Sequence, residues 1–439
     1  MMAPALPPLP GYLPAHGSDG YRVQHYDLEL EYRVSSGRLG GRARITASSD
    51  QILVAVSLDL GAFKVDRVLV NGKPARYRHG GGKLTVRPAT PLPAATPFVV
   101  EVRYVGVPKG IRSHWGELGW EHLDGGAMVA SQPIGAPSWY PCNDRPADKA
   151  TYRIAVTTAL PLTVVANGHL VSRQVGAGSA TWVYVQDVPT ASYLATIQIG
   201  SYELLDSAAG RIPERAAVPA RLITKFQYDF GRQHQMLALF EDRFGPYPFD
   251  EYAVVVVDEE LEVPVEAQGL SIFGKNHVDG RRGAERFVAH ELAHQWFGNS
   301  LTPLDWQHIW LNEGFASYSE WLWSQASGAE PASAHAARWR TRLAALPQDL
   351  ILGDPGVKQM FDDRVYRRGA LTLHALRTTI GDPAFFALLR EWTTTHRHGT
   401  VSTEQFTALA QRHTDVALAD FFTNWLFSPT LPSLPTTPG

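Results

Sequence analysis

The sequence predicts an α+β protein in which an antiparallel, β-rich N-terminal part precedes a mainly helical part. Up to about residue 205 the chain consists of short runs that alternate apolar and polar residues between turn residues, as half-buried strands do. Beyond about residue 213 the apolar residues recur at helical spacing in longer segments. We therefore expect a β-rich domain over residues 1–205, a mainly helical domain over 206–430, and a loose tail rich in Pro and Thr over 431–439.

The β-rich part contains two groups of predicted strands. The Asn71-Gly72 pair is typical of a two-residue hairpin turn and joins two of these runs. The predicted strands lie within residues 25–34, 41–48, 52–60, 66–78, 83–88 and 98–106, and then within 150–158, 162–168, 181–186 and 193–205.

The helical part opens with a predicted helix and a short apolar strand before the helices continue to the end. The strand, residues 252–258, is a run of valines typical of a fully buried strand. The predicted helices cover residues 226–243, 283–297, 305–325, 334–345, 364–379, 383–395 and 403–413.

Composition excludes several classes of partner. The chain has 439 residues, a net charge of −3 and a pI near 6.6, so it has no electrostatic footprint for nucleic acid or an anionic membrane. One cysteine, Cys142, rules out an internal disulfide and fits a reducing compartment. Neither a signal-peptide pattern nor a membrane-spanning run is visible in the sequence. We expect a cytoplasmic monomer.

The segment His290-Glu291-Leu292-Ala293-His294 places two imidazoles and a carboxylate on adjoining faces of one predicted helix. Residues four apart share a helix face, so His290 and His294 can bind one metal ion together. Glu291 is rotated by about 100° from His290, which places its carboxylate beside the metal, where it can contact a water. The pattern predicts a hydrolytic metal centre, with a structural histidine pair as the alternative.

Glu313 supplies a third ligand from the next predicted helix, nineteen residues after His294 (313 − 294). Two imidazoles and one carboxylate are a ligand set for catalytic zinc, whose open fourth position holds a water with a pKa near 7. We expect one Zn²⁺ per chain. Glu320 shares a helix face with Glu313 and is predicted either to orient a ligating imidazole or to be a surface glutamate.

With these residues in place, the chain resembles the M1 family of zinc aminopeptidases. The resemblance extends from about residue 20 to 430, and the absence of a segment matching the family's helical C-terminal domain predicts a less covered cleft. It implies a saddle-like N-terminal domain that contributes to the substrate amine site and a thermolysin-like catalytic domain. Its most specific segments are HELAHQWFGN (290–299), WLNEGFASYSE (310–320), FGPYPFDEY (244–252) and PCNDRPADKATY (141–152).

The resemblance also implies roles for three further residues. Tyr366-Arg367-Arg368-Gly369 matches the family's catalytic tyrosine motif, with Arg368 where lysine is usual, so Tyr366 is expected to stabilise the oxyanion. Gln132 and Glu266 match the residues that bind the substrate's amino group. The family's Gly-x-Met-Glu-Asn motif aligns with Val263-Pro264-Val265-Glu266-Ala267, which keeps only the glutamate. The nonfunctional alternatives are an exposed helix residue for Tyr366, a solvated acidic loop for Glu266 and a surface position for Gln132.

The resemblance therefore implies an aminopeptidase that removes N-terminal residues from peptides with a free N-terminus. A zinc-activated water would attack the peptide bond, with Glu291 as general base. Two other functions stay open, a thermolysin-like endopeptidase and a noncatalytic peptide-binding scaffold. An epoxide hydrolase side activity, as in leukotriene A4 hydrolase, is compatible with the same ligands.

Overall fold

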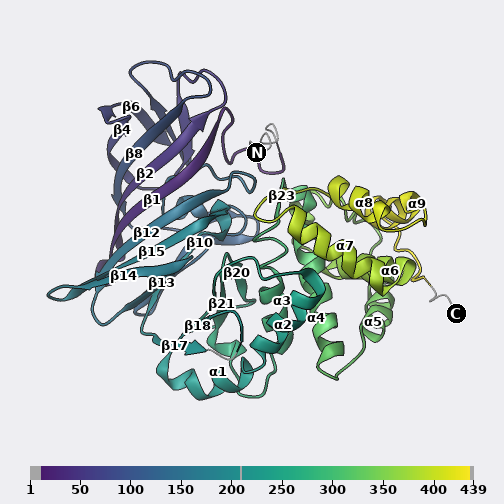
Figure 1. Ribbon diagram of the computed structural model, residues 1–439. Coiled ribbons are helices and arrows are strands. Elements are labelled where there is room, and N and C mark those ends of the chain that lie inside the picture. The colour runs from purple at the N-terminus through teal and green to yellow at the C-terminus, as the bar shows by residue number, and fades with distance from the viewer. Residues whose placement is uncertain (1–10, 208–209, 436–439) are drawn as a thin grey trace. The chain divides into compact units, whose positions relative to one another are not determined.

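The computed structural model describes residues 11–207 and 210–435 of the chain, which form two compact units (Figure 1). Among the described residues, the first unit contains 11–206, 215–221 and 251–275, and the second contains 207, 210–214, 222–250 and 276–435. Expectations for the first ten residues and for the end of the Pro- and Thr-rich tail lie outside the described residues.

An eight-stranded sheet is the largest element of the first unit. Its strand order is β14-β15-β12-β1-β2-β8-β4-β5. All neighbours in it are antiparallel except β1 and β12, which pair in parallel from His25 with Thr151 to Glu31 with Thr157. The bounds are β1 Tyr21–Arg33, β2 Arg38–Ser49, β4 Lys64–Val70, β5 Lys73–Pro74, β8 Pro97–Gly106, β12 Ala150–Ala159, β14 His169–Val175 and β15 Ser179–Thr190.

Three smaller sheets complete the first unit, with strand orders β13-β16-β11-β10-β9, β3-β7-β6 and β17-β18-β19-β21-β20. The first two contain β3 Val56–Asp59, β6 Arg76–Gly80, β7 Lys83–Arg87, β9 Ile111–Ser113, β10 Gly116–Leu123, β11 Gly126–Ala130, β13 Thr163–Ala166 and β16 Ile197–Gly200. The third contains β17 Glu203–Ser207, β18 Glu214–Val218, β19 Tyr252–Val257, β20 Val265–Ala267 and β21 Leu270–Gly274.

The alternation of apolar and polar residues in the sequence matches the alternation of buried and more exposed side chains in the large sheet. Along β1 every second side chain is buried over most of its length, and these residues join one apolar cluster with those of β2, β8, β12 and β15. The hairpin expected at Asn71-Gly72 is present, because β4 and β5 pair on either side of it and both residues have positive φ, 49° and 77°. The predicted antiparallel β-rich fold is confirmed, with β1 and β12 as the parallel exception in the large sheet.

The second unit is mainly helical. Its only sheet among the described residues is the parallel pair β22 Thr302–Pro303 and β23 Thr400–Val401. The helices are α1 Ile223–Asp229, α2 Gln233–Phe244, α3 Glu285–Ala293, α4 Trp310–Ala326, α5 Ala332–Ala344, α6 Asp363–Ile380, α7 Asp382–Thr395, α8 Thr403–Arg412 and α9 Ala419–Phe422.

Several expectations differ from the structure in detail. The helix expected over 283–297 ends at Ala293, the one expected over 305–325 begins at Trp310, and β9 to β11 lie where no strand was expected. The helix expected over 226–243 is two helices, α1 and α2, that meet near Gly231, where an added Cβ would lie 2.7 Å from the Gln227 carbonyl oxygen. The domain boundary expected near residue 205 does not coincide with the two units, because β18 and the strands from β19 to β21 pair within the first unit. Hydrogen bonding between strands distant in sequence determines that membership.

Helices α4 and α6 touch backbone to backbone at Gly314 and Gly369. A Cβ on Gly314 would lie 2.8 Å from the Cα of Gly369, and a Cβ on Gly369 would lie 2.6 Å from the Cα of Gly314. Real Cβ atoms do not approach backbone atoms this closely. The two glycines therefore set the spacing between the helix that carries Glu313 and the helix that carries Tyr366.

We expect Gly314→Ala to lower the free energy of unfolding by about 1 to 3 kcal/mol, because the helices must move apart. Alanine is otherwise better than glycine within a helix by about 1 kcal/mol, so a net loss reports the clash. Urea unfolding followed by circular dichroism measures it. Gly40→Ala is the control, since nothing lies within 4 Å of a Cβ there. Equal stability of the Gly314 variant and the parent would contradict the close contact.

Across residues 11–207 and 210–435, every helix is too short or too polar to traverse a lipid bilayer.

Candidate metal centre

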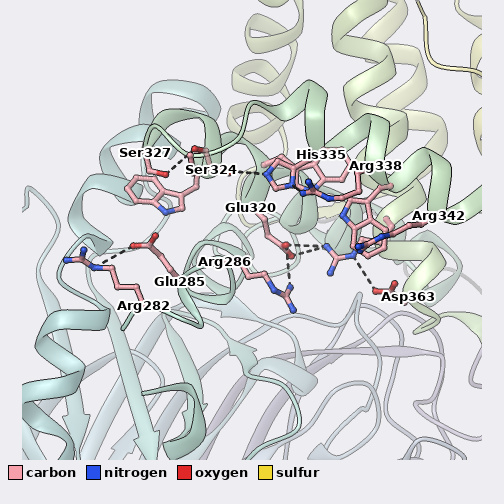
Figure 2. A pocket seen from close by; sticks show the side chains of 15 residues that line it. Arg282, Glu285, Arg286, Glu320, Ser324, Ser327, His335, Arg338, Arg342 and Asp363 are labelled. Carbon is pink, nitrogen blue, oxygen red and sulfur yellow. Dashed lines mark hydrogen bonds and ion pairs between the residues drawn. The ribbon is translucent and has the colours of Figure 1, made fainter. Parts of the chain in front are cut away.

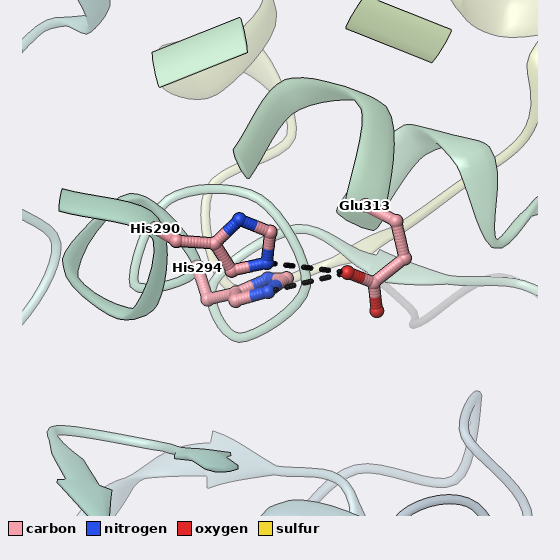
Figure 3. Close-up of side chains that lie close together, drawn as sticks. All are labelled: His290, His294 and Glu313. Atoms are coloured by element: carbon pink, nitrogen blue, oxygen red, sulfur yellow. Dashed lines mark ion pairs between the residues drawn. The ribbon is translucent and has the colours of Figure 1, made fainter. Parts of the chain in front are cut away.

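Three buried side chains of the second unit converge on one point. His290 belongs to the last turn of α3, and His294 is the residue that ends this helix. Glu313 lies in the first turn of α4. The Nε2 atoms of both histidines lie 3.5 Å from the Glu313 Oε2 atom (Figure 3). The structure thus brings together the three ligands expected from the sequence.

The partners of the two imidazoles show whether this group fits a cation. His290 donates its Nδ1–H to Glu320 Oε1 at 2.9 Å, and His294 donates its Nδ1–H to the Phe297 carbonyl oxygen at 3.0 Å. When the rings are neutral, both Nε2 lone pairs therefore face the space beside Glu313, and the three ligand atoms lie within 4.8 Å of one another. Zinc takes nitrogen and oxygen ligands, and ligating imidazoles commonly donate a hydrogen bond from their other ring nitrogen. The two histidines and Glu313 match both features.

The electrostatics of the two carboxylates, Glu313 and Glu320, also favour a cation. Burial lowers the pKa of His290, but hydrogen bonds with Glu313 and Glu320 outweigh burial and raise it to about 9. Burial raises the pKa of Glu313, while the charge of His294 and hydrogen bonds with both histidines lower it to about 2. Burial raises the pKa of Glu320, but the charge of Arg367 and the contacts with His290 outweigh burial and lower it to about 2. Both carboxylates are thus ionised at neutral pH.

Glu320 connects His290 to two arginines. Besides His290, its carboxylate accepts hydrogen bonds from Arg367 Nη1 at 3.2 and 3.3 Å. It also accepts one from Arg286 Nη1 at 3.4 Å (Figure 2). The side chain is 7% exposed, so the surface-glutamate alternative is wrong. Arginines that hold this carboxylate also fix the orientation of the His290 ring.

We expect Glu320→Gln to weaken zinc affinity by about 10- to 100-fold, because the His290 ring loses its anionic partner. Competition with a fluorescent zinc chelator measures this change. Glu391→Gln is a suitable control, since Glu391 is exposed and pairs with Arg412 and His413. Unchanged zinc affinity in the Glu320 variant would remove the orienting role.

Two more predicted site residues lie beside the metal ligands. A carboxylate oxygen of Glu291 lies within 4.8 Å of a His294 ring nitrogen, and the Glu291 side chain is buried. The Tyr366 ring, on α6, is nearly parallel to the His290 ring, with centroids 6.2 Å apart and an interplanar angle of 17°. Both residues therefore lie close enough to take part in chemistry at the metal.

The predicted amine-binding residues meet within the first unit. Gln132 Nε2 donates a hydrogen bond of 2.6 Å to Glu266 Oε1, across 134 positions of sequence. Glu266 is only 6% exposed in β20, whereas Asp258, Glu260 and Glu262 before it are exposed. The solvated-loop alternative is therefore wrong for Glu266.

Sequence reasoning missed the residues that support the site. Arg286 lies four residues before His290 on α3, and that helical spacing was the available signal. Arg367 directly follows Tyr366 in the tyrosine motif, and nothing in the sequence indicated its contact with Glu320. Its neighbour Arg368 is buried and donates to the carbonyl oxygens of Trp425, Leu350 and Pro429 at 3.1, 3.1 and 2.8 Å. Arg368 thereby ties α6 to the C-terminal segment, a contact that no local pattern reveals.

Two family models match the chain. The peptidase M1 N-terminal domain matches residues 22–194, and the peptidase family M1 domain matches residues 228–425. The curated relatives include the leukotriene A-4 hydrolase of Xenopus laevis, 27% identical over 68% of this chain and 51% of that protein. They also include the leucyl aminopeptidase of Saccharolobus solfataricus, 25% identical over 83% of this chain and 48% of that protein. The chain thus spans about half the length of these relatives.

A solved structure is similar over nearly the whole chain. It is the M1 zinc metallopeptidase from Deinococcus radiodurans, 31% identical, with a TM-score of 0.89 over 97% of this chain and 99% of that chain. A mutant of that metallopeptidase was solved bound to the substrate Tyr-Ser-Ala, with 31% identity and a TM-score of 0.88 over 97% of this chain and 98% of that one. Sequence identity at this level over both full lengths, together with the two family models, establishes that the chain belongs to peptidase family M1, a family of zinc metallopeptidases.

Proposed function

We propose that this chain is a zinc-dependent aminopeptidase that removes N-terminal residues from peptides. The observation that carries the proposal is the convergence of His290, His294 and Glu313, with Glu291 beside them. The relatives support the activity class, because they include a leucyl aminopeptidase and a metallopeptidase bound to a tripeptide substrate.

His290, His294 and Glu313 would hold the zinc ion. When bound, zinc lowers the pKa of a water toward about 7 and polarises the scissile carbonyl group. Glu291 takes a proton from the attacking water and returns it to the leaving nitrogen, so that an amine departs instead of an unstable amide anion. Burial of Glu291 keeps bulk water from competing for that proton.

Tyr366 would donate its phenolic hydrogen bond to the carbonyl oxygen as this oxygen gains negative charge. The bond strengthens as charge develops, so it stabilises the transition state more than the bound substrate. Stacking beside His290 keeps the Tyr366 ring at the metal ligands.

Glu266 and Gln132 would bind the substrate's α-ammonium group. Their mutual hydrogen bond holds a carboxylate and an amide oxygen together in a partly buried position, which suits a charged amine with several N–H donors. Fixing the amino end selects the first peptide bond for cleavage. This anchor is what would make the enzyme an exopeptidase and not an endopeptidase.

A pair of substrates that differ only at the N-terminus tests the proposal. A peptide with a free amino group should be cleaved one residue at a time, whereas its N-acetylated form should resist cleavage because it cannot present an ammonium group. Mass spectrometry of the products follows both reactions. Internal cleavage of the acetylated peptide would favour the thermolysin-like endopeptidase, and cleavage of neither peptide would favour the noncatalytic scaffold.

We expect Glu266→Gln to lower kcat/KM for free-amine substrates by about tenfold to a hundredfold, because one charge-assisted contact is lost. The isosteric amide keeps an acceptor for Gln132, so the fold should survive. Glu262→Gln, four residues earlier and exposed, is the matched control. Unchanged kcat/KM in the Glu266 variant would show that the amine binds elsewhere.

A further inference from the structure

A pocket of about 610 Å³ lies beside Glu320 in the second unit, within the volume range of small-molecule sites. Figure 2 shows the labelled side chains around Glu320, most of them from helices α3 to α6, with Arg282 and Ser327 just outside α3 and α4. The residues that line it include five arginines: Arg282, Arg286, Arg338, Arg342 and Arg367. The zinc chemistry described above uses none of this space.

Positive charge exceeds negative charge in the pocket. The five arginines face three lining carboxylates, those of Glu285, Glu320 and Asp363, which leaves an excess of two positive charges. Two of these carboxylates also serve groups outside the lining. Glu285 accepts two hydrogen bonds from Arg232, and Glu320 accepts one from His290. Arg338 is in turn paired at 2.7 Å with Glu330, which lies outside the lining, so partners outside the pocket neutralise groups of both signs.

His335, which also lines the pocket, accepts one hydrogen bond and donates another, and it carries no charge at neutral pH. Arg338 Nη2 donates to His335 Nδ1 at 2.9 Å, so the imidazole donates from Nε2 to Ser324 Oγ at 2.9 Å. Burial and the charge of Arg338 lower the pKa of His335. The pocket therefore keeps its positive excess at neutral pH without depending on this histidine.

Arg342 is the guanidinium most available to a ligand. Among residues 11–207 and 210–435 it has no carboxylate within ion-pair distance, and its guanidinium carbon lies 5.1 Å from the centroid of the Trp339 ring. Arg367 lies over the same ring at 4.7 Å. The indole orients two arginines without neutralising either of them.

Two buried donors of the lining have no hydrogen-bond acceptor in the described part of the chain. These are Trp323 Nε1 and Arg367 Nε. The Arg367 Nε atom lies 3.4 Å from an Asp363 oxygen, as an ion pair without hydrogen-bond geometry. Buried donors in native proteins are nearly always satisfied, so these two donors show that the wall holds more hydrogen-bond donors than the described chain supplies acceptors for.

We infer that this pocket binds a small multivalent oxyanion, a phosphate or a polycarboxylate. Arginine forks match the paired oxygens of either group, and one ligand with two or more negative charges would balance the positive excess. The inference goes beyond the proposed peptidase activity. Glu320 separates the pocket from the metal ligands, because it binds His290 with one oxygen and contacts Arg367, a residue of the pocket lining.

Isothermal titration calorimetry on the zinc-loaded enzyme tests the inference, with inorganic phosphate and tricarballylate as probes and chloride at equal ionic strength as reference. We expect saturable binding of at least one probe, weakened by about tenfold or more in Arg342→Ala, because a charged hydrogen bond is lost. The probe that binds more tightly identifies the ligand as phosphate-like or carboxylate-like. Binding at the zinc itself would persist in this variant and is thereby separated.

Arg281→Ala is the matched control, since Arg281 is exposed, adjacent to Arg282 and outside the pocket lining. It should bind both probes as the parent does. Thermal unfolding without added oxyanion should be the same for the Arg342 variant and the parent, because Arg342 is exposed. The inference is overturned if neither probe binds saturably, if Arg342→Ala binds as tightly as the parent, or if Arg281→Ala weakens binding equally.

Discussion

Glu291→Gln should lower kcat by about 10² to 10⁴-fold, the range that a positioned general base contributes. Glutamine has nearly the same shape but cannot accept a proton from water at neutral pH. Because Glu291 is not among the three converging ligands, the variant should keep its zinc. Steady-state kinetics on an aminoacyl chromogenic amide measures turnover, and elemental analysis of the same preparation measures the metal.

Two controls separate loss of the base from loss of the metal. Glu285→Gln makes the same chemical change on α3, at a carboxylate that pairs with Arg232, and should leave turnover largely intact. Stripping zinc from the parent with a chelator should abolish turnover, and adding zinc back should restore it. A Glu291 variant that turns over as fast as the parent would refute the assignment of the base.

Tyr366→Phe should lower kcat by about 10² to 10³-fold with little change in KM, because the lost hydrogen bond forms fully only in the transition state. The phenylalanine ring can still stack beside His290, so the structure and the zinc affinity should be preserved. The measurement is a comparison of kcat and KM on one chromogenic amide.

The matched control for this prediction is Tyr228→Phe, at an exposed tyrosine on α1. Its kinetics should equal those of the parent. A Tyr366 variant with unchanged kcat would show that another group stabilises the oxyanion, whereas a rise in KM alone would move Tyr366 from transition-state stabilisation to substrate binding.

Local sequence patterns were sufficient to predict features that depend on residues only a few positions apart. His290 and His294 face one way because they are four residues apart on one helix, and this geometry needs no tertiary information. The strands from β1 to β8 and the helices from α5 to α8 follow the periodicities read from the sequence within a few residues. The break between α1 and α2 was missed because the helical periodicity spans Gly231.

Long-range contacts were not predictable in the same way. The parallel pairing of β1 with β12 joins residues more than a hundred positions apart, and nothing in either strand specifies its neighbour. The same holds for the contact between Gly314 and Gly369, where the sequence shows two glycines but not that they touch. Arg368 illustrates it again, since its carbonyl partners lie in a segment with no recognisable pattern.

The sequence by itself predicted His290, His294 and Glu313 as metal ligands, Glu291 as the general base, and most of the strands and helices, because each prediction depends on residue type and short spacing or on a family motif. Only the tertiary structure decided that Glu320 is buried between His290 and two arginines, that Gln132 meets Glu266, and that five arginines line one pocket. The physical reason is that burial and pairing of charges arise from packing between segments distant in sequence, where the free energy depends on surroundings that no local pattern encodes.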